Sequence, residues 1–466
     1  MDRLDSIDIQ QAVTIQPVCV SENCRLDLSK LHQLNPQRYP FLLESVAKGV
    51  LGQYDILFAF PQDSISLDKV EDISDFQSRA KQAFSELKQP ELDCDLPFYG
   101  GWFAFFSYDY AQAVEPSLNL PESEFPLANL TRVPAAVVVD HEKGEISIVV
   151  ENEFTDLIET IWEDIDSALN VIDSQVPIQI VDSREEPENK YLDGVKAIKE
   201  YILSGDIFQV NLSRQWQVEL SHEQEYLDVY RALRTHNPAP FAALAHFADE
   251  KHEWSIISSS PERLVKYKSP WVETRPIAGT RKRSADAEMD KALIDELISH
   301  PKERAEHIML IDLERNDLGR ICQPGSVEVN ELMVVESYEH VHHIVSNVRG
   351  QLQDGFDPLD IVHALFPGGT ITGCPKVRCM EIIAELEQMP REAYTGSLGY
   401  INRDGSMDLN ILIRTMLHSR HGDKSVVQFR AGAGIVADSD PKNELTETRH
   451  KAKGLINALS SQERFL

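Results

Sequence analysis

PKERAEHIMLIDLERNDLGR, residues 301–320, is the stretch around which we expect the fold and the site to be organised. Pro301 suits the first turn of a helix, and Gly319 is typical of a helix end. Glu303 and Glu306 stand three positions apart, so a helix places both carboxylates on one face, within reach of a single hard cation. Four apolar residues are predicted to face a core, namely Ala305, Ile308, Met309 and Leu313.

A second acidic pair stands far downstream in SDPKNELTETRHKAK, residues 439–453. Glu444 and Glu447 are again three apart, so two helices could bring four carboxylates to one ion. Oxygen ligands without clustered Cys or His indicate magnesium, which keeps coordination sites open for an anionic substrate. Two plainer interpretations stay open: a solvated acidic helix face, and a surface ion pair between Glu447 and Lys451.

The composition is that of a folded protein with a strongly negative charge. The 466 residues suffice for two or three domains or one large one, and 42% hydrophobic with 26% charged residues is typical of globular chains. The net charge of −31 argues against nucleic acid and anionic membrane surfaces as partners. An anionic substrate therefore needs cations placed in its own pocket.

Three features predict a cytoplasmic chain that does not enter a membrane. The start, MDRLDSIDIQ, lacks the basic and apolar regions of a signal peptide. The most aromatic run, residues 100–111, is too short to span a bilayer. The cysteines lack zinc-ligand spacing and are sparse for a disulfide scaffold, so we expect reduced thiols at Cys19, Cys24, Cys94, Cys322, Cys374 and Cys379.

Apolar periodicity predicts more strands than helices. Residues 1–182 form a mixed amino-terminal subdomain, and the polar stretch DSREEPEN at 182–189 is predicted to be a linking loop before a catalytic domain at 190–460. In that domain we expect one strand at 409–416 and a glycine-rich turn at 430–440. Because the pattern lacks a regular βαβ alternation, we predict an α+β fold of large antiparallel, sandwich-like sheets with helices packed outside.

Five motifs occur together in the order of one family. They are SSSPERL (258–264), RPIAGT (275–280), the helix at 301–320, FPGGTITGCPKVRCMEII (366–383) and GAGIVADS (432–439). With them the chain resembles the chorismate-utilising enzymes, which include anthranilate, aminodeoxychorismate, isochorismate and salicylate synthases. The resemblance covers residues 193–459 and, more weakly, the amino-terminal half. It implies the fold of anthranilate synthase component I.

The resemblance also implies a site for chorismate and Mg²⁺, carried over position by position. The magnesium cluster would be Glu303, Glu306, Glu444 and Glu447. Catalytic roles fall to Glu262 as general acid or base, His343 beside the departing hydroxyl, and Thr280. Substrate-binding roles fall to Thr370, Tyr394, Arg414, Gly432, Gly434, Lys451 and Gln209. YPFLLES at 39–45 and NPAPF at 237–241 resemble a tryptophan pocket, with Glu44, Ser45 and Pro238 as its residues.

Plainer interpretations of two catalytic residues stay open. His343 could be a strand histidine with satisfied hydrogen bonds, and Glu262 could form a buried ion pair with Arg263.

Gln209 predicts the nucleophile, because isochorismate synthases resemble this segment but carry a lysine there to activate water. A glutamine cannot deprotonate water at neutral pH, so ammonia is the expected nucleophile. The segments QVNLS, VHHIVS and FPGGTITG favour the aminodeoxychorismate branch, which replaces the chorismate 4-hydroxyl for 4-aminobenzoate and folate synthesis. Ala278 stands where that branch's best-known pattern has a covalent lysine, so amination at the neighbouring carbon, as in anthranilate synthase, stays the alternative.

The resemblance further implies two protein partners. A separate glutaminase (glutamine amidotransferase) subunit would supply ammonia, because no glutamine-hydrolysing triad is recognisable in the sequence. An aminodeoxychorismate lyase would consume the product. A remote alternative is a non-catalytic, amino-acid-binding regulatory protein with the same fold.

Overall fold

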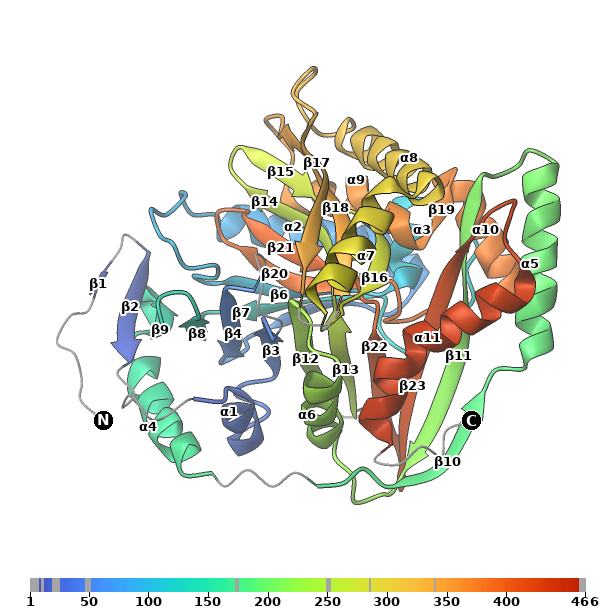
Figure 1. Cartoon of the computed structure of the whole chain (residues 1–466). Coiled ribbons are helices and arrows are strands. Elements are labelled where there is room, and N and C mark those ends of the chain that lie inside the picture. Colours follow the sequence, from blue (N-terminus) through green and yellow to red (C-terminus); the bar gives the residue numbers. More distant parts are fainter. Residues whose placement is uncertain are drawn as a thin grey trace.

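The computed structural model describes residues 8–9, 12–18, 26–46, 52–171, 176–248, 253–284, 286–338 and 341–460. Within them, two large antiparallel sheets carry the architecture (Figure 1). Sheet A has thirteen strands in the order β1 (Asp8–Ile9), β2 (Val13–Val18), β9 (Glu145–Glu151), β8 (Ala135–Asp140), β4 (Tyr54–Ala59), β3 (Phe41–Glu44), β12 (Phe241–Ala248), β13 (Glu253–Ser260), β22 (Thr415–His421), β23 (Lys424–Ile435), β11 (Gln209–Leu220) and β10 (Ile180–Glu185), with β19 (Gly373–Cys374) pairing with β11.

Sheet B has ten strands, and helices flank both sheets. Its order is β16 (Ile277–Lys282), β18 (Val341–Gln351), β15 (Trp271–Thr274), β14 (Arg263–Lys268), β21 (Met407–Asn410), β20 (Ser397–Asn402), β6 (Gly101–Phe106), β7 (Ala128–Val133) and β5 (Ser64–Leu67), with β17 (Glu328–Ser337) pairing with β18. The helices in the described residues are α1 (Ser29–Leu34), α2 (Ile73–Glu86), α3 (Ala111–Val114), α4 (Leu157–Leu169), α5 (Glu188–Leu203), α6 (Tyr226–His236), α7 (Ala287–Ser299), α8 (Pro301–Leu318), α9 (Pro358–Leu365), α10 (Lys376–Glu387) and α11 (Pro441–Leu459).

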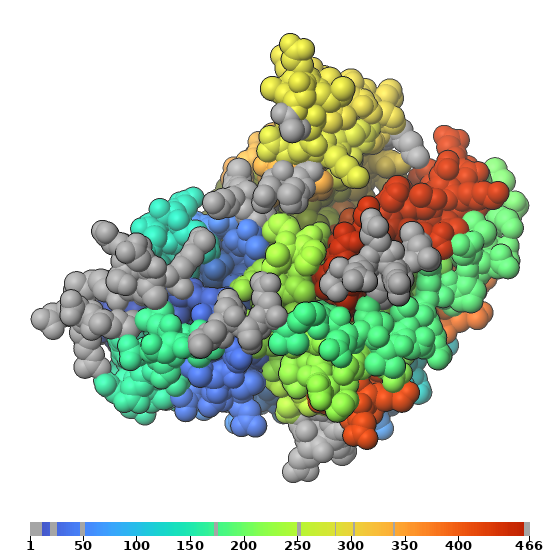
Figure 2. Space-filling view, turned by 60° about the horizontal axis from the view of Figure 1, so that its bottom comes forward, coloured from blue at the N-terminus to red at the C-terminus, as the bar shows by residue number. Residues whose placement is uncertain are grey.

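The two sheets enclose an aromatic core. Phe41 of β3 lies in sheet A and Phe103 of β6 in sheet B, and their rings stack with centroids 4.0 Å apart. Helices α6 and α11 pack on sheet A, whereas α8 and α9 pack on sheet B. Helices α7 and α8 project from one end of the molecule (Figures 1 and 2). The predicted α+β fold with helices outside two antiparallel sheets is confirmed.

Both halves of the chain build both sheets. Amino-terminal strand β3 pairs with β12, and β6 pairs with β20 of the carboxy-terminal part. The stretch 182–189 was predicted to be a loop, but residues 180–185 form β10 and pair with β11, while α5 begins at Glu188. The division at 182–190 stays a prediction. None of the helices within the described ranges is long and apolar enough to cross a bilayer.

Two predicted elements near the site are wrong. The single strand expected at 409–416 is split, because β21 lies in sheet B and β22 in sheet A, and residues 411–414 cross between them. Arg414 takes a left-handed backbone conformation at that crossing, with φ of 55°. The turn expected at 430–440 begins as strand, since β23 continues through Gly432 and Gly434 to Ile435.

Helix α8 buries a different face from the one predicted. Ile308 is 50% exposed and Ala305 is exposed, while Met309 and Leu313 are only partly buried. The buried residues are His307, Leu310, Ile311, Glu314, Asp317 and Leu318. Several are polar, and they are accommodated because they meet partners: His307 is hydrogen bonded to Ser346 and Asp317 to Lys376.

Candidate active site

Neighbouring strands β11 and β23 form the floor of the candidate site. Asn211 lies opposite Gly434 in the register of these strands, and Gln209 precedes it by two, on the same face. A Cβ atom on Gly434 would lie 2.6 Å from Gln209 Nε2, the end of a flexible side chain. A Cβ atom on Gly432 would clash with Asn211 Oδ1 and lie 2.9 Å from the Leu212 carbonyl oxygen, so glycine is required there.

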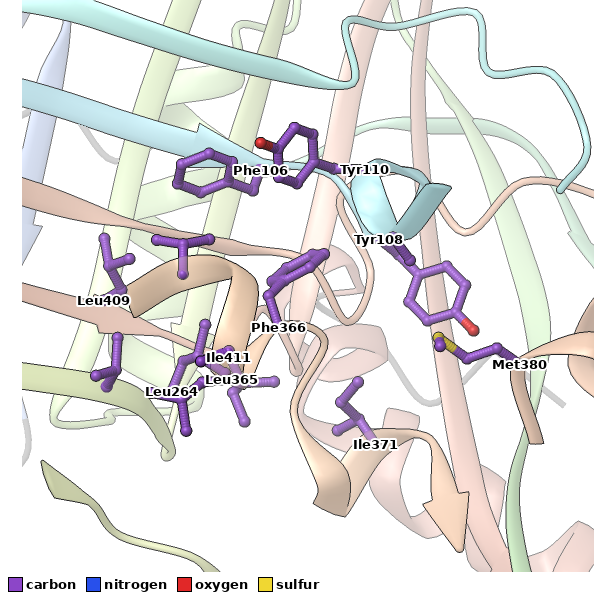
Figure 3. Packing of buried hydrophobic residues seen from close by; sticks show 14 of the residues in the cluster. Phe106, Tyr108, Tyr110, Leu264, Leu365, Phe366, Ile371, Met380, Leu409 and Ile411 are labelled. Carbon is purple, nitrogen blue, oxygen red and sulfur yellow. The ribbon is translucent and has the colours of Figure 1, made fainter. Parts of the chain in front are cut away.

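The FPGGT turn forms one wall and is anchored in the core by Phe366. The Phe366 ring packs against Phe106 and Tyr110, with centroids 6.3 and 6.0 Å apart (Figure 3). The Asn211 amide donates a hydrogen bond to the Thr370 carbonyl at 3.5 Å, which joins the turn to the floor. Thr370 Oγ1 is buried and finds no hydrogen-bond partner among the described residues.

Positive charge and hydroxyl donors gather at one end of the floor. Lys451 Nζ donates to the Gly432 carbonyl at 3.0 Å and also pairs with Glu447 at 2.8 Å. The Tyr394 hydroxyl also lies beside Gly432, since a Cβ atom built on that glycine would be 2.9 Å from the hydroxyl oxygen. The ion pair between Glu447 and Lys451 that the sequence left open is therefore present. It does not exclude a binding role for Lys451, whose ammonium has three donors.

Arg414 is the guanidinium that suits a substrate carboxylate best. It is partly buried, and across the described ranges no carboxylate forms an ion pair with it. Burial lowers the pKa of Arg414, while Tyr394 and Glu447 act to raise it, so both lie near the guanidinium. A planar, unpaired guanidinium at this position can give two parallel hydrogen bonds to one carboxylate.

Glu262 provides a proton-carrying acid. It follows β13 and is only 5% exposed, and its Oε1 atom finds no hydrogen-bond partner in the described part of the chain. Burial raises the pKa of Glu262 to about 8, although the nearby Thr370 hydroxyl and Lys451 act to lower it. Arg263 pairs instead with Asp408 at 2.8 Å, so the ion pair between Glu262 and Arg263 is not formed. The carboxyl is therefore protonated near neutral pH and can donate a proton.

His343 and Thr280 lie on paired strands β18 and β16. They are opposite each other in register, and a hydrogen bond of 2.9 Å joins Thr280 Oγ1 and His343 Nδ1. Burial lowers the pKa of His343 to about 4, so its imidazole is neutral near pH 7. Its hydrogen bond fits the plainer interpretation of a satisfied strand histidine, and its catalytic role stays a prediction.

The four predicted metal ligands lie on α8 and α11. Glu303 Oε1 accepts a hydrogen bond from Arg281 at 2.7 Å, whereas its buried Oε2 has no partner in the described chain. Glu306 is partly buried, Glu444 is 8% exposed, and Glu447 is exposed. Nowhere in the described ranges do three acidic, histidine or cysteine side chains lie close enough to hold a metal. The unpaired Glu303 oxygen and the all-oxygen donor set fit magnesium, but the cluster stays a prediction.

Two site residues, Asn211 and Tyr191, escaped the sequence interpretation. Asn211 Oδ1 and the Tyr191 hydroxyl are buried without hydrogen-bond partners in the described residues, as is Gln209 Oε1. Burial raises the pKa of Tyr191, and so do the nearby carboxylates Glu444 and Glu447. The signal for Asn211 was its spacing of two from Gln209 on one strand, which puts both on one face. Unpaired buried polar atoms are expected where a polar ligand binds.

The residues predicted to bind free tryptophan lie away from the candidate active site, near a cavity of about 500 Å³ between the sheets. Glu44, Ser45 and Pro240 line it, whereas Pro238 does not. Glu44 already pairs with Arg234 at 3.0 Å. The cavity is large enough for an amino acid, and tryptophan binding stays a prediction.

The chain matches the family of chorismate binding enzymes over residues 38–457 and belongs to that family. The chain is therefore a member of a class of chorismate-binding enzymes, as its sequence motifs predicted.

Relatives within the family carry two kinds of name. Aminodeoxychorismate synthase component 1 of Bacillus subtilis is 41% identical over 452 residues, covering 92% of this chain and 93% of the relative. An anthranilate synthase component I-like protein of Synechocystis sp. is 43% identical over 369 residues, covering 78% and 73%. The crystal structure of anthranilate synthase component I from Streptococcus pneumoniae TIGR4 superposes with a TM-score of 0.72 at 31% identity, covering 88% of this chain and 93% of the other.

Proposed function

We propose that the chain is the synthase component of an aminodeoxychorismate synthase, which replaces the 4-hydroxyl of chorismate with ammonia. The observation that carries the choice of ammonia as nucleophile is Gln209, whose neutral amide lies in the floor of the site beside Gly434. An amide cannot deprotonate water, whereas ammonia attacks without a base because its nitrogen lone pair is far more nucleophilic than the lone pairs of neutral water. The similarity to the Bacillus subtilis synthase over nearly the whole chain supports the same reaction.

Chorismate is a dicarboxylate, so the site must hold two negative charges within a protein of charge −31. Arg414, Tyr394 and Lys451 would bind the carboxylates at one end of the floor. Magnesium held by Glu303, Glu306, Glu444 and Glu447 would supply Lewis-acid polarisation of a carboxylate. These local cations offset the repulsion expected from the average field.

Glu262 would donate its proton to the departing ring hydroxyl, which leaves as water. The burial that keeps its carboxyl protonated near pH 7 makes it suited to this step. His343 is neutral near pH 7, and its hydrogen bond to Thr280 would orient the imidazole toward the departing hydroxyl. Ammonia would then form the new carbon–nitrogen bond and lose a proton.

Amination at the neighbouring carbon, giving anthranilate, is the second candidate. Ala278 favours it, because this residue is 9% exposed in β16, pairs with Ile344 and offers no nucleophile for a covalent step. The similarity to anthranilate synthase component I in sequence and structure also supports it. The segments QVNLS, VHHIVS and FPGGTITG resemble the aminodeoxychorismate branch and therefore favour amination at the 4-position.

We further propose a separate glutaminase subunit as the ammonia source, a lyase as the next enzyme, and the cytoplasm as the compartment. The name component 1 of the Bacillus subtilis relative supports a second component. Cys322, Cys374 and Cys379 are free thiols, which supports a reducing compartment, while Cys19 and Cys24 lie outside the described residues.

The test is to incubate the chain with chorismate, Mg²⁺ and excess ammonium at mildly alkaline pH, with and without added aminodeoxychorismate lyase. We expect 4-aminobenzoate only when lyase is present. Direct formation of fluorescent anthranilate without lyase would instead establish the second candidate.

A further inference from the structure

A second buried carboxyl, Glu314 of α8, lies behind the FPGGT turn. It is 5% exposed, and Thr274 Oγ1 donates a hydrogen bond to Glu314 Oε2 at 3.0 Å. Its other oxygen, Oε1, would lie 3.4 Å from a Cβ on Gly369, so the carboxyl packs directly against the turn. The Gly369 amide is close enough to act on it. Glu314 thus contacts both the turn and the end of β15.

Glu262 meets the same two backbone segments from the site. Thr370, the residue after Gly369, places its hydroxyl beside the Glu262 carboxyl, and the amide of Ile277, three residues after Thr274, faces that carboxyl as well. The two acids therefore share the FPGGT turn and the corner between β15 and β16. The charge of Glu314 acts on the Glu262 carboxyl, as expected for two acids that contact the same backbone segments.

We propose that Glu314 is a positioning residue for Glu262: its negative charge keeps the proton on the Glu262 carboxyl, and its contacts fix the turn that carries Thr370. This inference rests on the acid role proposed for Glu262. The contacts of Glu314 are with Thr274 and the FPGGT turn, so its proposed effect on the reaction is exerted through Glu262.

The charged groups around the pair support this direction. The charged neighbours that act on Glu314 are Asp317 and Lys376, and Lys376 forms an ion pair with Asp317 at 2.5 Å. Glu262 faces Glu314 and Lys451. Burial raises the pKa of both acids, and the Coulomb repulsion between the two carboxylates raises the pKa of Glu262 further. Once Glu314 is ionised, Glu262 therefore holds its proton to higher pH than burial alone would allow.

The test compares wild type, Glu314→Gln and Glu314→Asp. The glutamine is isosteric and can still hydrogen bond to Thr274, so it removes the charge and keeps the contact. Asp312→Asn is the matched control, because it removes a carboxylate from the same helix. The Asp312 side chain is 64% exposed and pairs with Arg315. Chorismate consumption is measured against pH at a fixed concentration of free ammonia, and the product is identified in each case. Thermal unfolding reports folding.

We expect the alkaline limb of kcat/KM to move to lower pH by roughly one unit in Glu314→Gln, to stay in place in Asp312→Asn and to return toward wild type in Glu314→Asp. A uniform loss of activity at every pH in Glu314→Gln would overturn the inference, since that is what a structural role gives. If Glu314→Gln fails to fold, Thr274→Val provides the test, because it removes the hydroxyl that donates a hydrogen bond to Glu314 and so makes Glu314 harder to ionise. The alkaline limb of kcat/KM should then also move to lower pH. An alkaline limb that stays in place would overturn the inference.

The proposed function fails separately. Anthranilate as the product would overturn amination at the 4-position, while the shift of the limb would still report on Glu314. Full activity in Glu262→Gln would overturn the acid role and the inference with it.

Discussion

Arg414 is the single residue whose geometry says most about the substrate. Its backbone is left-handed at the crossing between the sheets, and its guanidinium lies near Tyr394 and Glu447 without an ion pair to any carboxylate of the described residues. We predict that Arg414→Lys raises KM for chorismate by about tenfold or more, because lysine loses the bidentate pair and with it about 1.5–3 kcal/mol. Steady-state kinetics check this.

Arg349→Lys is the control, since this residue is paired at the surface with Glu328 at 2.7 Å. A KM equal to that of wild type in Arg414→Lys would show that Arg414 does not hold a substrate carboxylate.

Sequence reasoning at this scale succeeds where a residue belongs to a motif and fails where burial decides. Gln209 and Glu262 were found from their motifs, and the structure shows both with unpaired buried oxygens in the described chain. Glu314 was missed because an acidic residue on a helix is usually solvated, and its burial follows only from the packing of α8 on sheet B. Ile308 was assigned to the core because it is apolar, but its side chain is half exposed.

At the scale of elements, a buried acid joins α10 to the two strands of the floor. Glu387 accepts hydrogen bonds from Arg391 at 2.7 Å, Arg430 at 2.9 Å and the Ser213 hydroxyl at 2.8 Å. Burial acts to raise the pKa of Glu387, but the charges of Arg391 and Arg430 outweigh it and lower the pKa to about 2. This network holds Tyr394 and β23 in place beneath the site.

We predict that Glu387→Gln lowers the free energy of unfolding by about 3–5 kcal/mol, because two buried arginines lose their counter-ion. The folded pKa lies below the unfolded one, so the carboxylate stabilises the fold above pH 4.5 and loses this effect as the pH falls toward 2. Denaturant unfolding at several pH values should show a constant difference from wild type above about pH 5 that shrinks below it.

The exposed acid Glu381 of the same helix, paired with Arg378, is the control, and Glu381→Gln should change stability by less than about 0.5 kcal/mol. An equally small change in Glu387→Gln would contradict the account of the network.

Most strands near the site could be predicted, but their distribution between sheets could not. The helix predicted at 301–320 is present as α8, Pro301–Leu318, and the strand-rich pattern predicted from apolar periodicity is present as two sheets. The crossing at 411–414 was missed because Ile411, Leu412 and Ile413 continue the apolar run of β21, and only the pairing partners show that the chain changes sheets there.

At the scale of the whole molecule, the net charge of −31 contrasts with the cationic side chains of Arg414 and Lys451 at the candidate site. The fold and the family were accessible from the sequence because several long motifs occur in order, and the match to chorismate binding enzymes over residues 38–457 confirms them. Convergence of the four predicted metal acids does not follow from spacing alone, since helix packing sets the distance between α8 and α11.

The most direct measurement of the central claim, amination of chorismate by ammonia, is isotopic. Chorismate and Mg²⁺ are supplied with ¹⁵N-ammonium in H₂¹⁸O, and the product is analysed by mass spectrometry. The account predicts a product that carries ¹⁵N and no ¹⁸O. A product with ¹⁸O and no ¹⁵N would contradict it by showing that water is the nucleophile despite Gln209, and chorismate left unchanged would favour a non-catalytic regulator.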